Sequence, residues 1–298
     1  MTLRTASLSR GVLAISLALA WLGGCNADPH LDQPEPSPLV FEISGPDNSV
    51  EGWMLGTIHA LPDGTRWRTP ATKTAISEAD YVIVEIANLG DSNARKAFAE
   101  LSSNAARTPL TERVAPELRD PLGQLIKDAG LSADTLSAMD TWAVALTLAQ
   151  TNATGDPRNG VDRAVIAEFA ERGVREFEGS LVQLRIFDSL APADQRTLLE
   201  EVISDASDDV DQSGELREAW LTGDIEELEE ATTTGMMADP ELREAILTGR
   251  NRAWAARLLS DLEAPERPLV AVGTAHLVGP EGLPALLEQA GYSVRAIN

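Results

Sequence analysis

Cysteine and histidine are both scarce in this sequence. Its 298 residues include one cysteine and three histidines. A single cysteine cannot form a disulfide within the chain, so a disulfide-stapled scaffold is excluded. It also cannot build a zinc site from several thiolates. With so few histidines, catalysis that depends on imidazole has few positions available to it.

Basic residues are few as well. The chain has 24 Lys and Arg against 47 Asp and Glu, which gives a net charge of -23 and a pI near 4.4. Nucleic-acid binders need cations that neutralise phosphate, so that class is excluded. The same charge repels anionic membrane surfaces. An apolar content of 43% is still enough to bury the core of one large domain or two small ones.

Several sequence motifs that are typical of common enzymes and nucleotide-binding proteins are absent. The sequence contains no Gly-X-Gly-X-X-Gly or Walker loop, no Gly-X-Ser-X-Gly elbow and no His-Glu-X-X-His. Nucleotide-binding and serine-hydrolase functions therefore lack their motifs. A metalloprotease would have to be of another type.

The first 24 residues are predicted to be a signal peptide. A basic start precedes an uncharged apolar run over residues 11–22, which is too short to span a bilayer comfortably. The run ends in Leu-Gly-Gly-Cys, which resembles the lipobox of bacterial lipoproteins, where the cysteine is diacylated. Cys25 is therefore the predicted lipidation site; the alternative is an ordinary secretory signal. Asn26 stands where inner-membrane lipoproteins often have aspartate, so we expect an outer-membrane lipoprotein facing the periplasm.

Residues 25–38 are predicted to form an extended, proline-rich tether, and residues 39–298 a folded domain. Hydrophobic periodicity predicts an α/β (α+β) fold with strands at both ends and a large helical middle region. The predicted strands are residues 40–43, 52–58, 81–86, 174–177, 268–273 and 292–297. The predicted helices are residues 69–79, 92–106, 115–129, 133–149, 162–172, 193–204, 213–222, 225–234, 240–262 and 282–290.

The two ends of the domain repeat one pattern. A strand leads into Gly-Thr-X-His at residues 56–59 and again at residues 273–276, each followed by a Pro/Gly loop, a helix and a strand. Such duplicated units are expected to form a central parallel sheet, which binds ligands beyond the carboxyl ends of its strands. His59 and His276 are therefore expected to converge if the two units pair.

Histidines in matched contexts indicate a functional pair, because neutral imidazole offers a lone pair as a metal ligand or general base. The alternative is that each bonds a loop at a strand end. Glu85 lies in an apolar strand, where an unpaired carboxylate would cost on the order of several kcal/mol, unless it faces solvent on an edge strand. Together His59, His276 and Glu85 are a ligand set that zinc and other divalent ions use.

For three other polar residues, a purely structural role is the alternative to a functional one. Asp162 could be a helix N-cap with no other role. Arg250 and Asn251 could lie on a solvated or salt-bridged helix face.

In their order along the chain, these motifs resemble the TraB/GumN family, which includes the Tiki proteins. The resemblance spans roughly residues 41–297. It is carried by residues 53–59 with Leu61-Pro62, residues 79–85, Gly160-Val161-Asp162, Phe177-Glu178 with Gln183, Trp220 with Gly223-Asp224, Arg250-Asn251 with Trp254, and residues 272–277 with the glycines that follow. Arg66-Trp67 departs from the pattern, because a second proline is expected there.

The resemblance implies a fold similar to the erythromycin-esterase and ChaN group, with a duplicated sheet core flanked by helices. It also implies a metal-dependent peptidase activity that uses manganese or cobalt rather than zinc, as in animal Tiki members. The family's catalytic set falls on His59, Glu85 and His276. Its other polar pair falls on Arg250 and Asn251, which would hold substrate or transition-state charge.

The resulting hypothesis is a lipoprotein hydrolase that acts on peptides or proteins and touches the membrane through its lipid alone. Asp162 and Glu178 are expected to bind substrate, and Glu178 is the second candidate after Glu85 for a carboxylate base. The competing hypothesis is a non-catalytic lipoprotein of the ChaN type that binds haem, metal or peptide. Only the enzyme needs an open ligand position for water and a carboxylate base.

Overall fold

The structure is a computed structural model that describes residues 33–88, 92–103, 108–152, 155–207 and 212–297. The predicted signal peptide and Cys25 lie outside the described residues. Within them, no helix combines the length and apolar character needed to cross a membrane.

The described residues form a six-stranded mixed sheet in the order β4-β3-β5-β2-β1-β6. Its strands are β1 (Val40–Ser44), β2 (Val50–Thr57), β3 (Tyr81–Val84), β4 (Val174–Glu176), β5 (Pro268–Gly273) and β6 (Ser293–Ala296). Strands β2, β5, β3 and β4 pair in parallel, whereas β1 pairs antiparallel with both β2 and β6. The predicted α/β class and duplicated sheet are confirmed.

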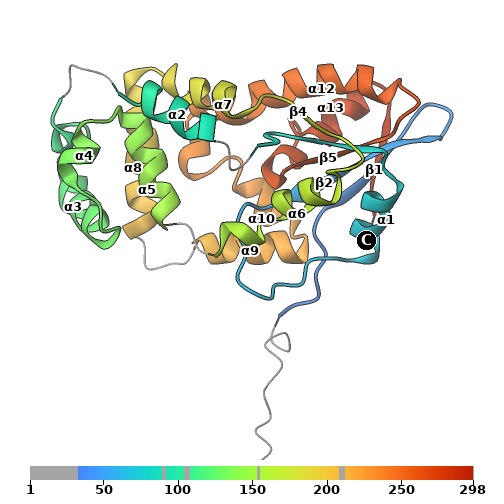
Figure 1. Ribbon diagram of the computed structural model, residues 1–298, viewed down its shortest axis with the longest axis horizontal. Coiled ribbons are helices and arrows are strands. Elements are labelled where there is room, and N and C mark those ends of the chain that lie inside the picture. The colour runs from blue at the N-terminus through green and yellow to red at the C-terminus, as the bar shows by residue number, and fades with distance from the viewer. Residues whose placement is uncertain (1–32, 89–91, 104–107, 153–154, 208–211, 298) are drawn as a thin grey trace, which may run out of the picture.

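The two repeated units cross the sheet in opposite directions. β2 connects through α1 (Pro70–Glu78) to β3, whereas β5 connects through α13 (Leu283–Gln289) to β6 at the other edge. Because crossovers are almost always right-handed, opposite directions place the two helices on opposite faces. In Figure 1, α13 indeed lies above the sheet and α1 below it. The adjacent strands β2 and β5 are therefore the switch point, where α/β sheets bind ligands.

Helices make up most of the remaining described chain. They are α2 (Ser92–Leu101), α3 (Arg119–Asp128), α4 (Ala133–Ser137), α5 (Thr141–Asn152), α6 (Val161–Glu168), α7 (Ser180–Asp188), α8 (Pro192–Ser207), α9 (Gln212–Thr222), α10 (Ile225–Glu230), α11 (Pro240–Arg243) and α12 (Gly249–Leu262). Short 3-10 segments are η1 (Leu110–Glu112), η2 (Pro116–Leu118), η3 (Pro157–Asn159), η4 (Gly235–Ala238) and η6 (Thr274–Leu277), and η5 (Glu244–Thr248) is a π-helix.

Local capping chemistry explains where α1 begins. The Thr69 side chain accepts a hydrogen bond from the Thr72 N–H, and the Thr72 side chain bonds back to the Thr69 backbone. Pro70 follows the cap at a position where its missing N–H costs nothing. The predicted start at residue 69 is therefore confirmed to within one position.

Two hydrophobic clusters support the fold. The first surrounds the sheet and includes Trp220 and Trp254 from the flanking helices. The second lies among helices of the middle region, including α3, α5 and α8, and is centred on Trp142, whose ring meets Phe98 edge to face. Figure 1 shows this helical body at the end of the molecule opposite to the sheet. The helical middle region therefore has a core of its own and presents one edge to the sheet.

Several helix predictions differ from the structure; those over residues 162–172 and 225–234, for example, end early, at residues 168 and 230. The predicted helix over residues 133–149 is broken into α4 and α5, because the Asp140 N–H donates to the Ser102 carbonyl. The chain becomes helical again at Thr141. The predicted helix over residues 240–262 contains the π-helix η5. Helix α7 was not predicted; it begins after Gly179, whose positive φ of 79° turns the chain sharply.

Gly56→Ala tests the tight contact at the switch point. A Cβ at Gly56 would lie 2.6 Å from the Thr274 side-chain oxygen, so we expect a loss of ~1–3 kcal/mol in the free energy of unfolding. Gly123→Ala in α3 is the matched control, because its Cβ would meet nothing within 4 Å, and it should stabilise by ~0.5 kcal/mol. Equal effects of the two substitutions in urea titrations would contradict this packing.

Candidate active site at the carboxyl ends of the strands

The two repeated motifs meet side by side. β2 and β5 pair in parallel with Thr57 opposite Gly273, and the Thr274 side chain donates to the Thr57 carbonyl over 3.2 Å. Gly56 therefore pairs with Val272, one residue out of step with the sequence repeat. β2 and β5 therefore pair, which is the arrangement that the expected convergence of His59 and His276 requires.

His59 follows β2 and is oriented by helix α6. Its Nδ1 lies 2.8 Å from Asp162 Oδ2, and because a carboxylate only accepts, the imidazole donates from Nδ1 and keeps a lone pair on Nε2. The side chain is 72% exposed, whereas Asp162 is nearly buried. The hydrogen bond to Asp162 raises the pKa of His59 above its ordinary value. Asp162, predicted to bind substrate, thus also positions a histidine.

A glycine makes this arrangement possible. The Val161 N–H donates to the Ile58 carbonyl, which joins the start of α6 to the segment that carries His59. A Cβ at Gly160 would lie 2.4 Å from the His59 carbonyl oxygen. Close approach of the two segments therefore requires glycine at that position.

His276 lies in η6 and is buried. Its Nδ1 is 2.5 Å from Asn251 Oδ1, and the Asn251 amide nitrogen in turn donates to the Glu281 carbonyl over 2.8 Å. That second bond fixes which end of the amide faces the ring, so Nδ1 carries the hydrogen and Nε2 the lone pair. Burial lowers the pKa of His276 to about 4, so the ring is neutral at pH 7. In its neutral form each histidine therefore carries its lone pair on Nε2, and in His276 that nitrogen lies 3.4 Å from Arg250 Nη1.

Glu85 shares a buried guanidinium with Glu178. Arg250 Nη2 lies 2.7 Å from Glu85 Oε2 and 3.0 Å from Glu178 Oε2, while Arg250 Nε contacts both oxygens of Glu178. The Trp254 indole N–H also donates to Glu178 over 3.0 Å. All three charged side chains are largely buried, with exposed fractions of 8% for Arg250, 10% for Glu178 and 13% for Glu85. Arg250 is therefore salt-bridged, but inside the site rather than on a solvated face.

The remaining contacts of Glu85 favour its ionised form. Oε1 accepts the Gly273 N–H at 2.9 Å and lies 3.8 Å from His276 Nε2, and the Gln183 amide approaches Oε2 at 3.4 Å. Burial by itself raises the pKa of Glu85, but the electrostatic effects of His276 and Arg250 and the Gly273 hydrogen bond outweigh it and lower the pKa to about 2. Glu85 is thus a buried carboxylate at neutral pH.

Of these groups, His59, Asp162, Glu85 and Gln183 border one cavity of about 380 Å³. It is lined by Thr57, His59, Ala60, Val84, Glu85, Ile86, Gln150, Pro157, Asp162, Arg163, Gln183 and Ala271. Residues from β2, β3, α5, α6 and α7 thus enclose the space, which opens at the switch point of the sheet. Sequence reasoning did not identify Gln150 or Arg163, since neither lies in a recognisable catalytic motif.

An aromatic stack packs against His276. Trp254 lies 4.4 Å from the imidazole centroid, and Phe177 stacks on Trp254 with their planes 8° apart. Arg250 lies over the Trp254 ring at 4.5 Å. The stack limits rotation of the ring and of the guanidinium beside it.

Comparison with known proteins identifies the family. The profile of the TraB/PrgY/gumN family matches residues 39–296. The chain belongs to this family. It is similar to YbaP of Shigella flexneri, an uncharacterised protein, with 26% identity over 83% of this chain and 91% of YbaP. YbaP of Escherichia coli K12 is 26% identical over 78% of this chain and 86% of its own length. No solved structure matches this member of the family significantly.

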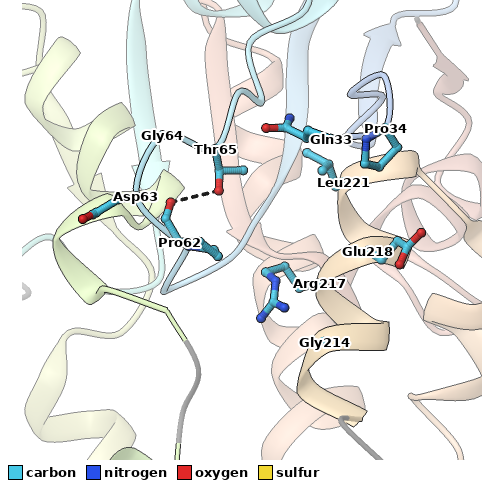
Figure 2. Close-up of a pocket in the computed structure, with 10 residues that line it drawn as sticks. All are labelled: Gln33, Pro34, Pro62, Asp63, Gly64, Thr65, Gly214, Arg217, Glu218 and Leu221. Atoms are coloured by element: carbon cyan, nitrogen blue, oxygen red, sulfur yellow. Dashed lines mark hydrogen bonds between the residues drawn. The ribbon is translucent and has the colours of Figure 1, made fainter. Parts of the chain in front are cut away.

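In this TraB/PrgY/gumN protein a second cavity, of about 390 Å³, lies behind the loop that follows His59. Figure 2 shows it between residues 62–65, helix α9 and the end of the predicted tether. The Gln33 side chain donates to the Arg66 carbonyl and accepts from the Arg66 N–H, and the Ser37 N–H donates to the Leu221 carbonyl. Residues 33–38 contain neither helix nor strand, yet they are attached to the domain.

The low pKa of His276 predicts how stability changes with pH. A histidine in the unfolded chain takes up a proton below its ordinary pKa of about 6.5, whereas the buried ring resists protonation down to about pH 4. Folding is therefore favoured above pH 6.5. Between about pH 7.5 and about pH 4.5, the free energy of unfolding should fall by roughly 2 kcal/mol more in the wild type than in a His276→Gln variant. Urea unfolding of both proteins at both pH values measures the difference. Identical pH dependence would show that His276 is not buried in a neutral form.

Proposed function

We propose that this protein is a divalent-metal-dependent hydrolase that cleaves peptide bonds. The observation that carries the proposal is the pair of imidazoles, each held through Nδ1 by an oxygen acceptor so that Nε2 carries the lone pair, beside the ionised Glu85 carboxylate. Metal-bound histidines typically donate their other N–H to such an acceptor. Peptide as the substrate rests on the likeness to the Tiki proteins.

The donor chemistry of the site fits a divalent cation. Metal ligands must be deprotonated, and both the neutral His276 and the carboxylate of Glu85 already are. Two carboxylates share the single Arg250 cation, so this buried cluster has an excess negative charge that a further cation would balance. Within the described part of the chain, however, no three His, Cys, Asp or Glu side chains are already gathered around one point.

His59, His276 and Glu85 are the residues that would hold the ion, and manganese or cobalt rather than zinc is proposed from the family likeness. When bound, such an ion lowers the pKa of a water molecule and polarises a carbonyl group. His59 lies on the exposed wall of the cavity, where its Nε2 can alternatively take a proton from water, with Asp162 stabilising the imidazolium. Glu85 serves as ligand or as base.

The other polar residues hold these groups in place. Arg250 supplies positive charge next to the reacting centre, where it can stabilise a developing oxyanion. Asn251 fixes the tautomer of His276, and Glu178 holds the guanidinium from the far side. Asp162 and Gln183 also line the cavity, where a substrate backbone could hydrogen-bond to them.

Metal binding and peptide cleavage test the proposal together. The full chain, loaded with manganese, cobalt or zinc and dialysed, should retain about one ion per molecule and should cleave members of a broad peptide library. His276→Ala and Glu85→Gln should each weaken metal binding by at least ~10-fold, as expected for loss of a ligand. Calorimetry and elemental analysis measure the affinity and the stoichiometry.

The third histidine of the sequence provides the matched control. His30 belongs to the predicted tether, so His30→Ala should leave metal content and cleavage unchanged. A wild-type protein that stays metal-free after loading would overturn the metal assignment. If metal is bound, peptides stay intact and haem titrates with a defined stoichiometry, then the alternative of a non-catalytic binding protein replaces the enzyme.

We also propose that the protein is an outer-membrane lipoprotein facing the periplasm, attached through Cys25. In bacterial cells the wild-type chain should take up labelled palmitate and sediment with the outer membrane. Cys25→Ser should take up no label and should be released as a soluble or unprocessed chain, because a thiol is required for diacylation. Lipid labelling that persists in the Cys25→Ser variant would contradict the assignment.

A further inference from the structure

A π-helix immediately precedes the residues that contact His276. Over η5, the Gly249 N–H donates to the Glu244 carbonyl five residues earlier, and α12 then starts at Gly249. One extra residue is thereby accommodated in the turn, relative to the four-residue spacing of an α-helix. Such insertions lower the quality of the backbone hydrogen bonds, so a local benefit must balance that cost.

Directly after the π-helix, two consecutive residues contact the same imidazole. Asn251 Oδ1 is 2.5 Å from His276 Nδ1, and Arg250 Nη1 is 3.4 Å from His276 Nε2. Neighbouring residues of a regular α-helix point about 100° apart around its axis. Holding both nitrogens of one ring from consecutive positions therefore needs side chains directed by more than helix geometry.

For Arg250 the π-helix supplies that direction through one of its own carbonyls. Arg250 Nη1 donates to the Ile246 carbonyl over 2.9 Å, so a backbone oxygen of the π-turn holds the guanidinium on the side that faces His276. The same guanidinium then reaches Glu85 and Glu178 through its other nitrogens. The turn, the arginine and the two acids form one connected network.

Two residues, Thr248 and Gly249, hold the shape of the turn. A Cβ at Gly249 would lie 2.7 Å from the Glu244 carbonyl oxygen, so the turn closes only around glycine. The Thr248 hydroxyl donates to the Glu244 carboxylate over 2.7 Å, and Thr248 itself is buried. Both features act on the five-residue turn rather than on the site.

We propose that the π-helix Glu244–Thr248 is a positioning element that fixes the tautomer of His276, with Gly249 and Thr248 as its positioning residues. The element acts through the orientation of Asn251 and Arg250 around the ring. Only its catalytic consequence rests on the proposed function, because a binding protein would need the same tautomer, with the lone pair on Nε2.

Ring nitrogen NMR of His276 tests the proposal in the metal-free full chain. In the wild type at pH 7, the ¹⁵N shifts should show one tautomer, protonated at Nδ1 and unprotonated at Nε2, and the signals should vanish in His276→Gln. In Gly249→Ala the two shifts should move toward their common mean, because Asn251 no longer holds Nδ1–H in place. Unchanged shifts in a folded Gly249→Ala variant would overturn the proposal.

A second pair of variants covers the case in which Gly249→Ala does not fold. Thr248→Val keeps the shape of the side chain and removes the hydroxyl, so the ring shifts should move in the same direction as above. Thr248→Ser keeps the hydroxyl and should retain the wild-type shifts. Indistinguishable spectra for Thr248→Val and Thr248→Ser would then overturn the proposal. Since these readouts need no metal or substrate, an inactive wild-type protein would refute the proposed function and leave this inference standing.

Discussion

The sharing of one buried guanidinium by two carboxylates is the interaction on which the rest of this structure depends. Arg250 comes from α12, Glu85 follows β3 and Glu178 follows β4, so the ion pairs join two parallel strands to the helix that covers their face. Removing one partner from such a buried pair leaves an uncompensated charge at a cost of about 3–5 kcal/mol. These charges can therefore remain buried only because each is paired, and their pairing fixes the position of the cavity wall.

The topology of the sheet explains why the reactive groups meet here. β2 and β5 are neighbours, yet their connections leave toward opposite edges, so the loops after them diverge and leave a space at their carboxyl ends. The two histidines occupy unlike positions in that space: His59 is largely exposed on the cavity wall, whereas His276 is buried behind Glu85. A sequence repeat has thus produced two chemically different imidazoles, because the pKa of His59 is raised above its ordinary value and that of His276 is lowered.

The supporting residues are as specific as the reactive ones. Asp162 and Asn251 perform the same task for the two histidines, although one is a carboxylate and the other an amide. The choice has a physical basis: a carboxylate beside His59 favours the imidazolium, whereas an amide beside His276 orients the ring without adding charge. Asp162 and Glu178 were predicted to bind substrate, and the contacts that the structure shows for them are with His59 and Arg250.

The sequence alone determined the fold class and the repeated strand-turn-helix units and indicated His59, His276 and Glu85 as candidate site residues, because hydrophobic periodicity and local motifs are properties of neighbouring residues. Family membership could be predicted from the sequence for the same reason. Only the tertiary structure decided that Glu85 faces Arg250 rather than solvent, that β2 and β5 pair one residue out of step with the repeat, and that a π-turn directs Arg250 and Asn251. These features arise from contacts between segments far apart in the chain. Neither amino-acid composition nor the spacing of motifs shows which side chains become buried or which charges lie next to them.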